Sequence, residues 1–132
     1  MRIFLSLLFV LLLTGNVFAQ QQDSLNVKDF SKGIKKERPV ILDVRRPEEY
    51  AEGHIKKAVN INWQNQDEFR TKASQLQKSE PVYVYCRSGV RSAKAVEWLR
   101  SNGFTQVVGL SGGMKAWVAA DKRVVNKGKT NK

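Results

Sequence analysis

The chain has 132 residues and a formal net charge of +11, so it has room for a single domain and its charge suits anionic partners such as anionic small molecules, acidic surfaces or nucleic acid. It contains one cysteine, which excludes an intramolecular disulfide. A lone thiol in a chain of this kind therefore needs an explanation.

Residues 1–19 have the pattern of a signal peptide. Arg2 supplies positive charge, residues 3–13 are almost wholly apolar, and Val17 and Ala19 stand at the −3 and −1 positions of a cleavage site. The apolar run is shorter than the ~20 residues that span a bilayer, so we expect cleavage rather than a stable membrane anchor. The sequence thus predicts export, with the periplasm as the expected compartment, and export argues against nucleic acid as a partner.

After a polar lead-in over residues 20–26, residues 27–120 alternate between helical and strand patterns. The expected helices cover 27–34, a short stretch from Pro47, 67–77, 92–102 and 114–120, and the expected strands cover 40–44, 58–61, 82–86 and 106–110. This order predicts one α/β domain with a mostly parallel central sheet flanked by helices on both faces. Residues 121–132 are predicted to form a basic, solvated and poorly ordered tail.

The single cysteine, Cys86, stands at the end of the apolar strand 82–86 and before a helix. The connecting segment, residues 86–92, is predicted to turn its backbone N–H groups inward above the positive end of that helix. Such a cradle favours a thiolate, which is the nucleophilic form of cysteine. The alternative is a buried cysteine that acts as a small hydrophobic residue, but the sequence Arg-Ser-Gly after Cys86 fits that alternative poorly.

Four ordered motifs resemble the rhodanese family of sulfurtransferases in its single-domain form. They are Leu42-Asp43-Val44-Arg45 with Glu48-Glu49-Tyr50, Gly53-His54-Ile55 with Ala58 and Asn60-Ile61, Cys86 to Ser92, and Leu110-Ser111-Gly112-Gly113 with Trp117. The resemblance implies a Cys86 persulfide that carries a sulfane sulfur from thiosulfate or a similar small anionic donor to a thiophilic acceptor. No metal and no cofactor are expected, and the oligomeric state is left open.

The same resemblance assigns roles to the residues around the thiol. Asp43 and Arg45 are expected to help order the site, although a purely structural ion pair explains them equally well. The expected substrate-binding residues are Arg87, Ser88, Gly89, Val90, Arg91 and Ser92. Among them, Arg87 and Arg91 are candidates for binding the anionic donor.

Three other functions remain as alternatives. A thiol-based phosphatase needs five residues between cysteine and arginine, whereas four residues separate Cys86 from Arg91. A non-enzymatic persulfide carrier, or a module that docks on an acidic partner, would keep the thiol but turn over poorly. A role as a peroxide sensor is made less plausible by the absence of a second cysteine.

His54, the only histidine, suggests a cysteine–histidine pair, but its glycine and isoleucine neighbours suit a turn better.

Overall fold

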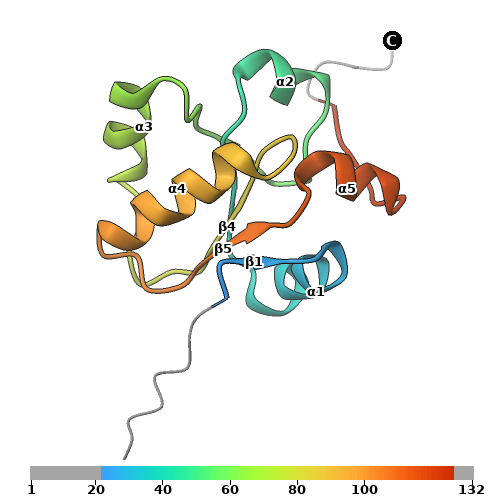
Figure 1. Ribbon diagram of the computed structural model, residues 1–132, viewed down its shortest axis with the longest axis horizontal. Coiled ribbons are helices and arrows are strands. Elements are labelled where there is room, and N and C mark those ends of the chain that lie inside the picture. Colours follow the sequence, from blue (N-terminus) through green and yellow to red (C-terminus); the bar gives the residue numbers. More distant parts are fainter. Residues whose placement is uncertain (1–21, 127–132) are drawn as a thin grey trace, which may run out of the picture.

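The computed structural model describes residues 22–126, so the predicted signal peptide at 1–19 lies outside the described residues. Within residues 22–126, strands and helices alternate along the chain (Figure 1). The strands are β1 (Ser24–Leu25), β2 (Val40–Asp43), β3 (Val59–Asn60), β4 (Val82–Tyr85) and β5 (Val107–Leu110). The helices are α1 (Val27–Glu37), α2 (Pro47–Glu52), α3 (Gln66–Ala73), α4 (Val90–Ser101) and α5 (Gly113–Ala119).

The strands form one sheet in the order β1-β5-β4-β2-β3, and every neighbouring pair is parallel. Strand β4 lies at the centre and is buried along its whole length, which explains its continuous apolar sequence. It pairs with β2 from Val40 opposite Val82 to Asp43 opposite Tyr85. These pairings confirm the predicted α/β domain with a parallel central sheet.

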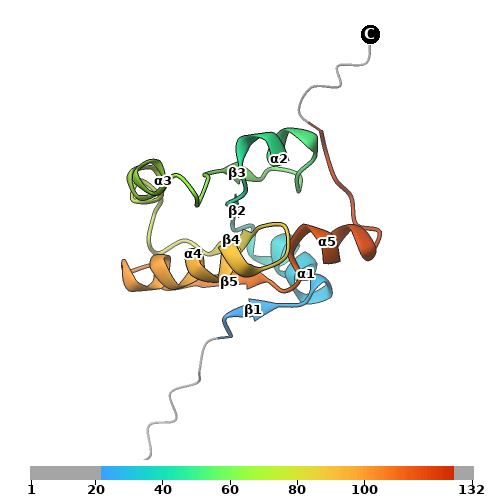
Figure 2. The same ribbon diagram turned by 45° about the horizontal axis from the view of Figure 1, so that its top comes forward.

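Side chains of β2, β4 and β5 contribute to two apolar clusters, one on each face of the sheet. Leu42 and Val84 face the cluster that contains residues of α3 and α4, such as Phe69 and Leu99. The other cluster contains residues of α1 and α5, and α2 adds a half-buried tyrosine. Figure 2 shows α3 on the left and α1 and α5 on the right, with α4 in front of the strands. Helices therefore cover both faces, as the sequence predicts.

Strand β1 lies within the segment that the sequence presents as a polar lead-in. It pairs with β5 through backbone groups, because Gly109 N–H donates to Asp23 O over 2.9 Å and Ser111 N–H donates to Leu25 O over 2.8 Å. The guanidinium of Arg100 also holds the Asp23 carboxylate. Backbone pairing at a sheet edge needs no apolar pattern, so the polar composition of residues 20–26 did not predict this strand.

The first part of the predicted tail is also packed against the domain. Val125 and His54 form an antiparallel bridge with N–H to O distances of 2.8 and 2.9 Å. Trp117 Nε1–H donates to Arg123 O over 3.0 Å, and Val124 packs against the apolar cluster of α1 and α5. The prediction of a solvated segment from residue 121 is thus wrong for Val124 and Val125, which are half-buried, whereas the side chains of residues 121–123 and 126 are exposed and residues 127–132 lie outside the described residues. Among residues 22–126, no helix has the length and apolar character to cross a membrane.

Candidate active site

Cys86 follows the last residue of the central strand β4, at the carboxyl edge of the sheet. Parallel sheets place their binding and catalytic sites at this edge, because the loops after neighbouring strands meet there. The thiol is buried, with 1% of the residue exposed. Cys86 thus lies where a site is expected, with its sulfur shielded from solvent.

The connection from Cys86 to α4 is shorter than the sequence predicts. Helix α4 begins at Val90 rather than at Ser92, and Gly89 is its N-cap with a φ of 107°. This left-handed conformation is accessible to glycine and reverses the chain within a few residues. Val90, Arg91 and Ser92 therefore form the first turn of α4, and the N–H group of Ser92 points back toward the sulfur.

Hydrogen bonds surround the sulfur of Cys86. Gly89 N–H donates to Sγ over 3.1 Å, and Ser92 Oγ lies 3.4 Å from Sγ. Burial opposes ionisation of the thiol and is the largest single influence on it, but the Ser92 hydroxyl and the N–H groups of Ser92, Gly89 and Ser88 together outweigh it. The pKa of the Cys86 thiol therefore lies below its ordinary value. The predicted cradle is present.

The Ser92 hydroxyl has one proton and two acceptors within reach. Its Oγ–H donates to Gly89 O over 3.1 Å while the thiol proton faces Oγ. When Cys86 ionises, a rotation of the Ser92 hydroxyl brings its proton to the sulfur. The hydrogen bond to Gly89 O is then lost, and a charge-assisted bond from Oγ–H to the thiolate sulfur offsets this loss. Ser92 can thus stabilise either protonation state of the thiol.

The N-terminus of α5 fixes the start of the loop. Met114 N–H donates to Cys86 O over 2.8 Å, and Lys115 N–H donates to Arg87 O over 3.0 Å. Gly113 makes this approach possible, because a Cβ at that position would lie 2.5 Å from Cys86 O and its φ is 58°. In the sequence, Gly113 is named only as part of a family motif. The pair of glycines before a helix was the available signal for a close backbone contact.

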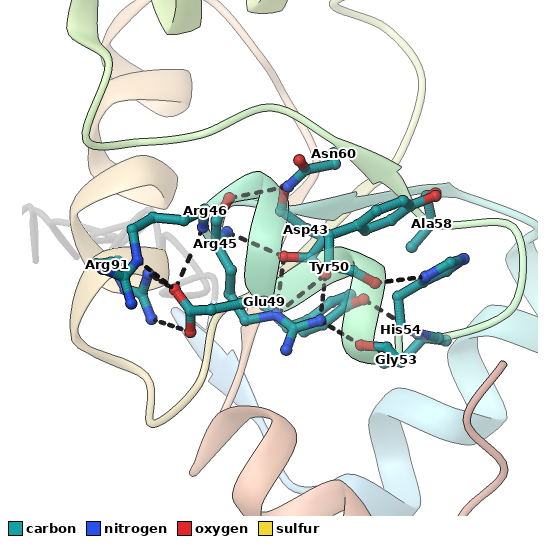
Figure 3. A network of polar contacts seen from close by, with 12 residues as sticks. Asp43, Arg45, Arg46, Glu49, Tyr50, Gly53, His54, Ala58, Asn60 and Arg91 are labelled. Carbon is teal, nitrogen blue, oxygen red and sulfur yellow. Dashed lines mark hydrogen bonds and ion pairs between the residues drawn. The ribbon is translucent and has the colours of Figure 1, made fainter. Parts of the chain in front are cut away.

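Asp43 and Arg45 form a buried ion pair at the end of β2 (Figure 3). The Arg45 guanidinium donates to both carboxylate oxygens, with Nη2 2.7 Å from Oδ2, and also to Gly53 O over 2.6 Å. Asn60 Nδ2 donates to the backbone oxygens of both residues. This network ties β2 to the end of α2 and to β3, so the pair orders the edge of the sheet beside the loop.

Arg91 is paired with Glu49 of α2 rather than free within the loop (Figure 3). Its Nη1 and Nη2 donate to the two carboxylate oxygens over 2.7 and 3.0 Å. The Arg91 guanidinium is the main cause that lowers the pKa of Glu49 to about 2, against partial burial and with help from Arg46. Because both terminal nitrogens are engaged, the geometry gives Arg91 a positioning role between α2 and α4. The sequence places Glu49 in a family motif but does not predict its pairing with Arg91, since the two residues lie far apart along the chain.

The remaining loop residues point outward. The side chains of Arg87 and Ser88 are exposed, and Val90 is 63% exposed. Arg87 lines a groove of about 560 Å³ together with Arg45 and Lys115. Glu49 and Glu52 also line this groove, but Glu49 is neutralised by Arg91. Asp43 likewise neutralises Arg45, so among residues 22–126 the groove offers Arg87 and Lys115 as cations without an ion pair, beside the unpaired Glu52, to an anion that approaches the loop.

His54 contacts α2 and the end of the described chain. Its ring stacks on Tyr50 with centroids 3.8 Å apart, and Nδ1 lies 2.9 Å from Tyr50 O. The thiol of Cys86 instead accepts a hydrogen bond from Gly89 N–H and donates one to Ser92 Oγ. The structure therefore gives His54 a packing role. Within residues 22–126, no group of three or more His, Cys, Asp or Glu side chains could hold a metal ion.

Together, the fold and the loop define an α/β domain that holds one acidified thiol in a hydrogen-bonding cradle at the carboxyl edge of a parallel sheet. Residues 26–120 match the Rhodanese-like domain family, and the chain belongs to that family.

Two curated relatives and one solved structure illustrate this membership. An uncharacterised protein, YqhL of Bacillus subtilis, is 33% identical over 83% of this chain and 84% of its own. Thiosulfate sulfurtransferase GlpE of Coxiella burnetii is 37% identical over 65% of this chain and 78% of its own. The crystal structure of a rhodanese-related protein from Thermoplasma volcanium is 35% identical, covers 79% of this chain and 98% of its own, and has a TM-score of 0.70. The family assignment made from the four sequence motifs is confirmed.

Proposed function

We propose that the protein is a sulfurtransferase that moves a sulfane sulfur from thiosulfate, or a similar anionic donor, to a thiophilic acceptor through a Cys86 persulfide. The proposal rests on the hydrogen bonds that the loop donates to the sulfur of Cys86, because these bonds lower the pKa of the thiol. Similarity to a protein named thiosulfate sulfurtransferase supports the choice of donor.

The proposed reaction has two displacements at sulfur. In the first, the Cys86 thiolate attacks the sulfane sulfur of thiosulfate, the new bond joins Sγ to that sulfur, and sulfite leaves with the electron pair of the broken bond. In the second, a nucleophile such as cyanide attacks the terminal sulfur and leaves as thiocyanate, while Sγ recovers its electron pair. Neither step needs a further oxidant, reductant, metal or cofactor.

The loop supports both anionic states of this cycle. The N–H groups that stabilise the thiolate would also stabilise a persulfide anion on Cys86, and preorganised donors of this kind often make the largest contribution to catalysis. Arg87 and Lys115, which line the groove and are exposed, are proposed to attract the donor. Gly89, Ser92 and Gly113 hold the cradle, and Arg91 fixes it to α2.

Two observations favour sulfur transfer over phosphate ester hydrolysis. Four residues separate Cys86 from Arg91, so the loop is one residue shorter than a phosphatase loop and suits a single sulfur atom. The Arg91 guanidinium is also engaged by Glu49 and is not free to bind a phosphoryl group.

The experiment is a comparison of substrates on one preparation of the protein. We expect steady thiocyanate formation from thiosulfate and cyanide, and no hydrolysis of a phosphate ester such as p-nitrophenyl phosphate. Hydrolysis without sulfur transfer would overturn the proposal. A single round of sulfur loading without turnover would support the persulfide carrier instead.

We also propose that the protein acts after export to the periplasm, on the strength of the signal pattern in residues 1–19. Fractionation of cells that express the full chain should recover a protein whose N-terminal residue is Gln20 in the periplasmic fraction. Recovery of the uncleaved chain from the cytoplasm would contradict this proposal.

A further inference from the structure

A second groove, here called the basic groove, lies between α1, the segment that precedes β3, and the chain after α5. Its volume is about 800 Å³, and none of its lining residues belongs to the Cys86 loop. Figure 1 shows α1 and α5 next to each other, and Figure 2 keeps them together on one side of the sheet. The basic groove is therefore a feature separate from the thiol site.

The rim of the basic groove carries cations from three separate segments. They are Lys35, Arg38, Lys56, Lys57, Lys122 and Arg123, and all six side chains are exposed. No acidic residue lines the groove, and none of the six forms an ion pair within residues 22–126. Like charges at one rim repel each other, so an anionic occupant would relieve that repulsion.

The floor of the basic groove is apolar. Ile34 of α1 is half-buried there, and Ile41, Ile55 and Trp117 lie deeper, each at most 5% exposed. An apolar floor inside a charged rim suits an occupant with both acidic groups and an apolar side chain. A small inorganic anion would leave the floor unused.

The backbone holds the rim segments in place. Arg38 ends α1 in a left-handed conformation with φ 49°, and its N–H donates to Ile34 O over 3.1 Å. Lys57 has a φ of 69°. The indole N–H of Trp117 holds the carbonyl of Arg123. The groove is thus built before any occupant arrives, which lowers the entropic cost of binding.

We propose that the basic groove is a docking site for an acidic segment of a partner protein, with an apolar side chain of that segment seated on the groove floor. The concave shape favours a peptide over an anionic membrane, because a bilayer surface is flat and the apolar groups here are recessed. The last six residues of this chain are an unsuitable occupant, since they contain three lysines and no acid. This proposal does not depend on the sulfur chemistry of Cys86.

The test measures binding of a short fluorescein-labelled peptide of alternating glutamate and leucine to the purified protein by fluorescence anisotropy. The double variant Lys56→Glu/Lys122→Glu should weaken binding about tenfold or more, because two attractive charges become repulsive. The matched control is Arg70→Glu/Lys78→Glu, which reverses two exposed cations outside the groove and should change the Kd less than about twofold. Both variants should keep the sulfur transfer rate to cyanide.

A second peptide, with serine in place of leucine, tests the apolar floor and should bind about tenfold more weakly than the leucine peptide. Equal loss of binding in the groove and control variants would mean diffuse charge attraction and would overturn the proposal. The last measurement is binding of the natural protein and the groove variant to vesicles of anionic phosphatidylglycerol. If the groove variant lost binding to these vesicles but kept its affinity for the peptide, the groove would be a lipid site and the proposal would be wrong.

Discussion

The ion pair between Glu49 and Arg91 gives a quantitative prediction about stability. A carboxyl whose pKa falls from its ordinary 4.5 to about 2 on folding stabilises the folded state by about 3 kcal/mol at neutral pH. Only 14% of the Glu49 side chain and 20% of the Arg91 side chain are exposed, so solvent screens the pair less than a surface pair. Since the folded pKa is the lower one, this stability is present above about pH 4.5 and is lost as the pH falls through about 2.

The substitution Glu49→Gln removes the charge and keeps the shape of the side chain. We expect the free energy of unfolding at neutral pH to fall by about 3 kcal/mol relative to the natural chain. The difference between the two proteins should then shrink as the pH is lowered from about 4.5 towards 2, because the natural carboxyl becomes neutral. Urea unfolding followed by circular dichroism at a series of pH values measures both quantities.

Glu97→Gln is the matched control, because it removes one charge from an exposed helical residue that has no ion pair within residues 22–126. It should change the free energy of unfolding by less than about 0.5 kcal/mol. Our reasoning would be refuted if Glu49→Gln matched this control at neutral pH. It would also be refuted by a deficit of the same size at every pH, since ionisation of Glu49 would then not be its source.

Three further substitutions test the cradle. Ser92→Ala should raise the pKa of the Cys86 thiol, so that the midpoint of its alkylation by iodoacetamide moves to higher pH; an unchanged midpoint would remove Ser92 from the cradle. Gly113→Ala should lower the rate of sulfur transfer on the order of 100-fold, because the added Cβ displaces the loop by ~1 Å. Gly103→Ala is its control: the backbone strain is similar, but only a lysine side chain lies near the added Cβ, so the rate should not change. Arg91→Ala should lower both the free energy of unfolding, by about 2 kcal/mol, and the transfer rate, and normal stability with a normal rate would contradict the positioning role.

The regular part of the fold was accessible from the sequence because its strands are buried on both faces. Such strands read as continuous apolar runs, so β2 and β4 were placed within about one residue. The edge strand β1 and the segment around Val125 were missed because both are held through backbone hydrogen bonds. Leu25 and Val124 also pack against the cluster of α1 and α5, but single apolar residues do not make a strand pattern.

The candidate site also has a part that the sequence predicted and a part that it did not. Cys86 and its cradle were predictable, because a strand, a glycine-containing turn and a helix follow one another directly in the sequence. The Glu49 partner of Arg91 was not, since only the packing of α2 against the start of α4 brings the two residues together. The same holds for Gly113, whose contact with Cys86 O depends on how α5 approaches the loop.

The central claim is that Cys86 carries sulfur as a persulfide, and the most direct measurement is the mass of the intact protein. After incubation with thiosulfate the mass should increase by one sulfur atom, and cyanide should return it to the starting value. Cys86→Ser should show neither change, because the chain has no other thiol. Thiocyanate production by Cys86→Ser at the natural rate, or turnover of the natural chain without any increase in mass, would contradict the account.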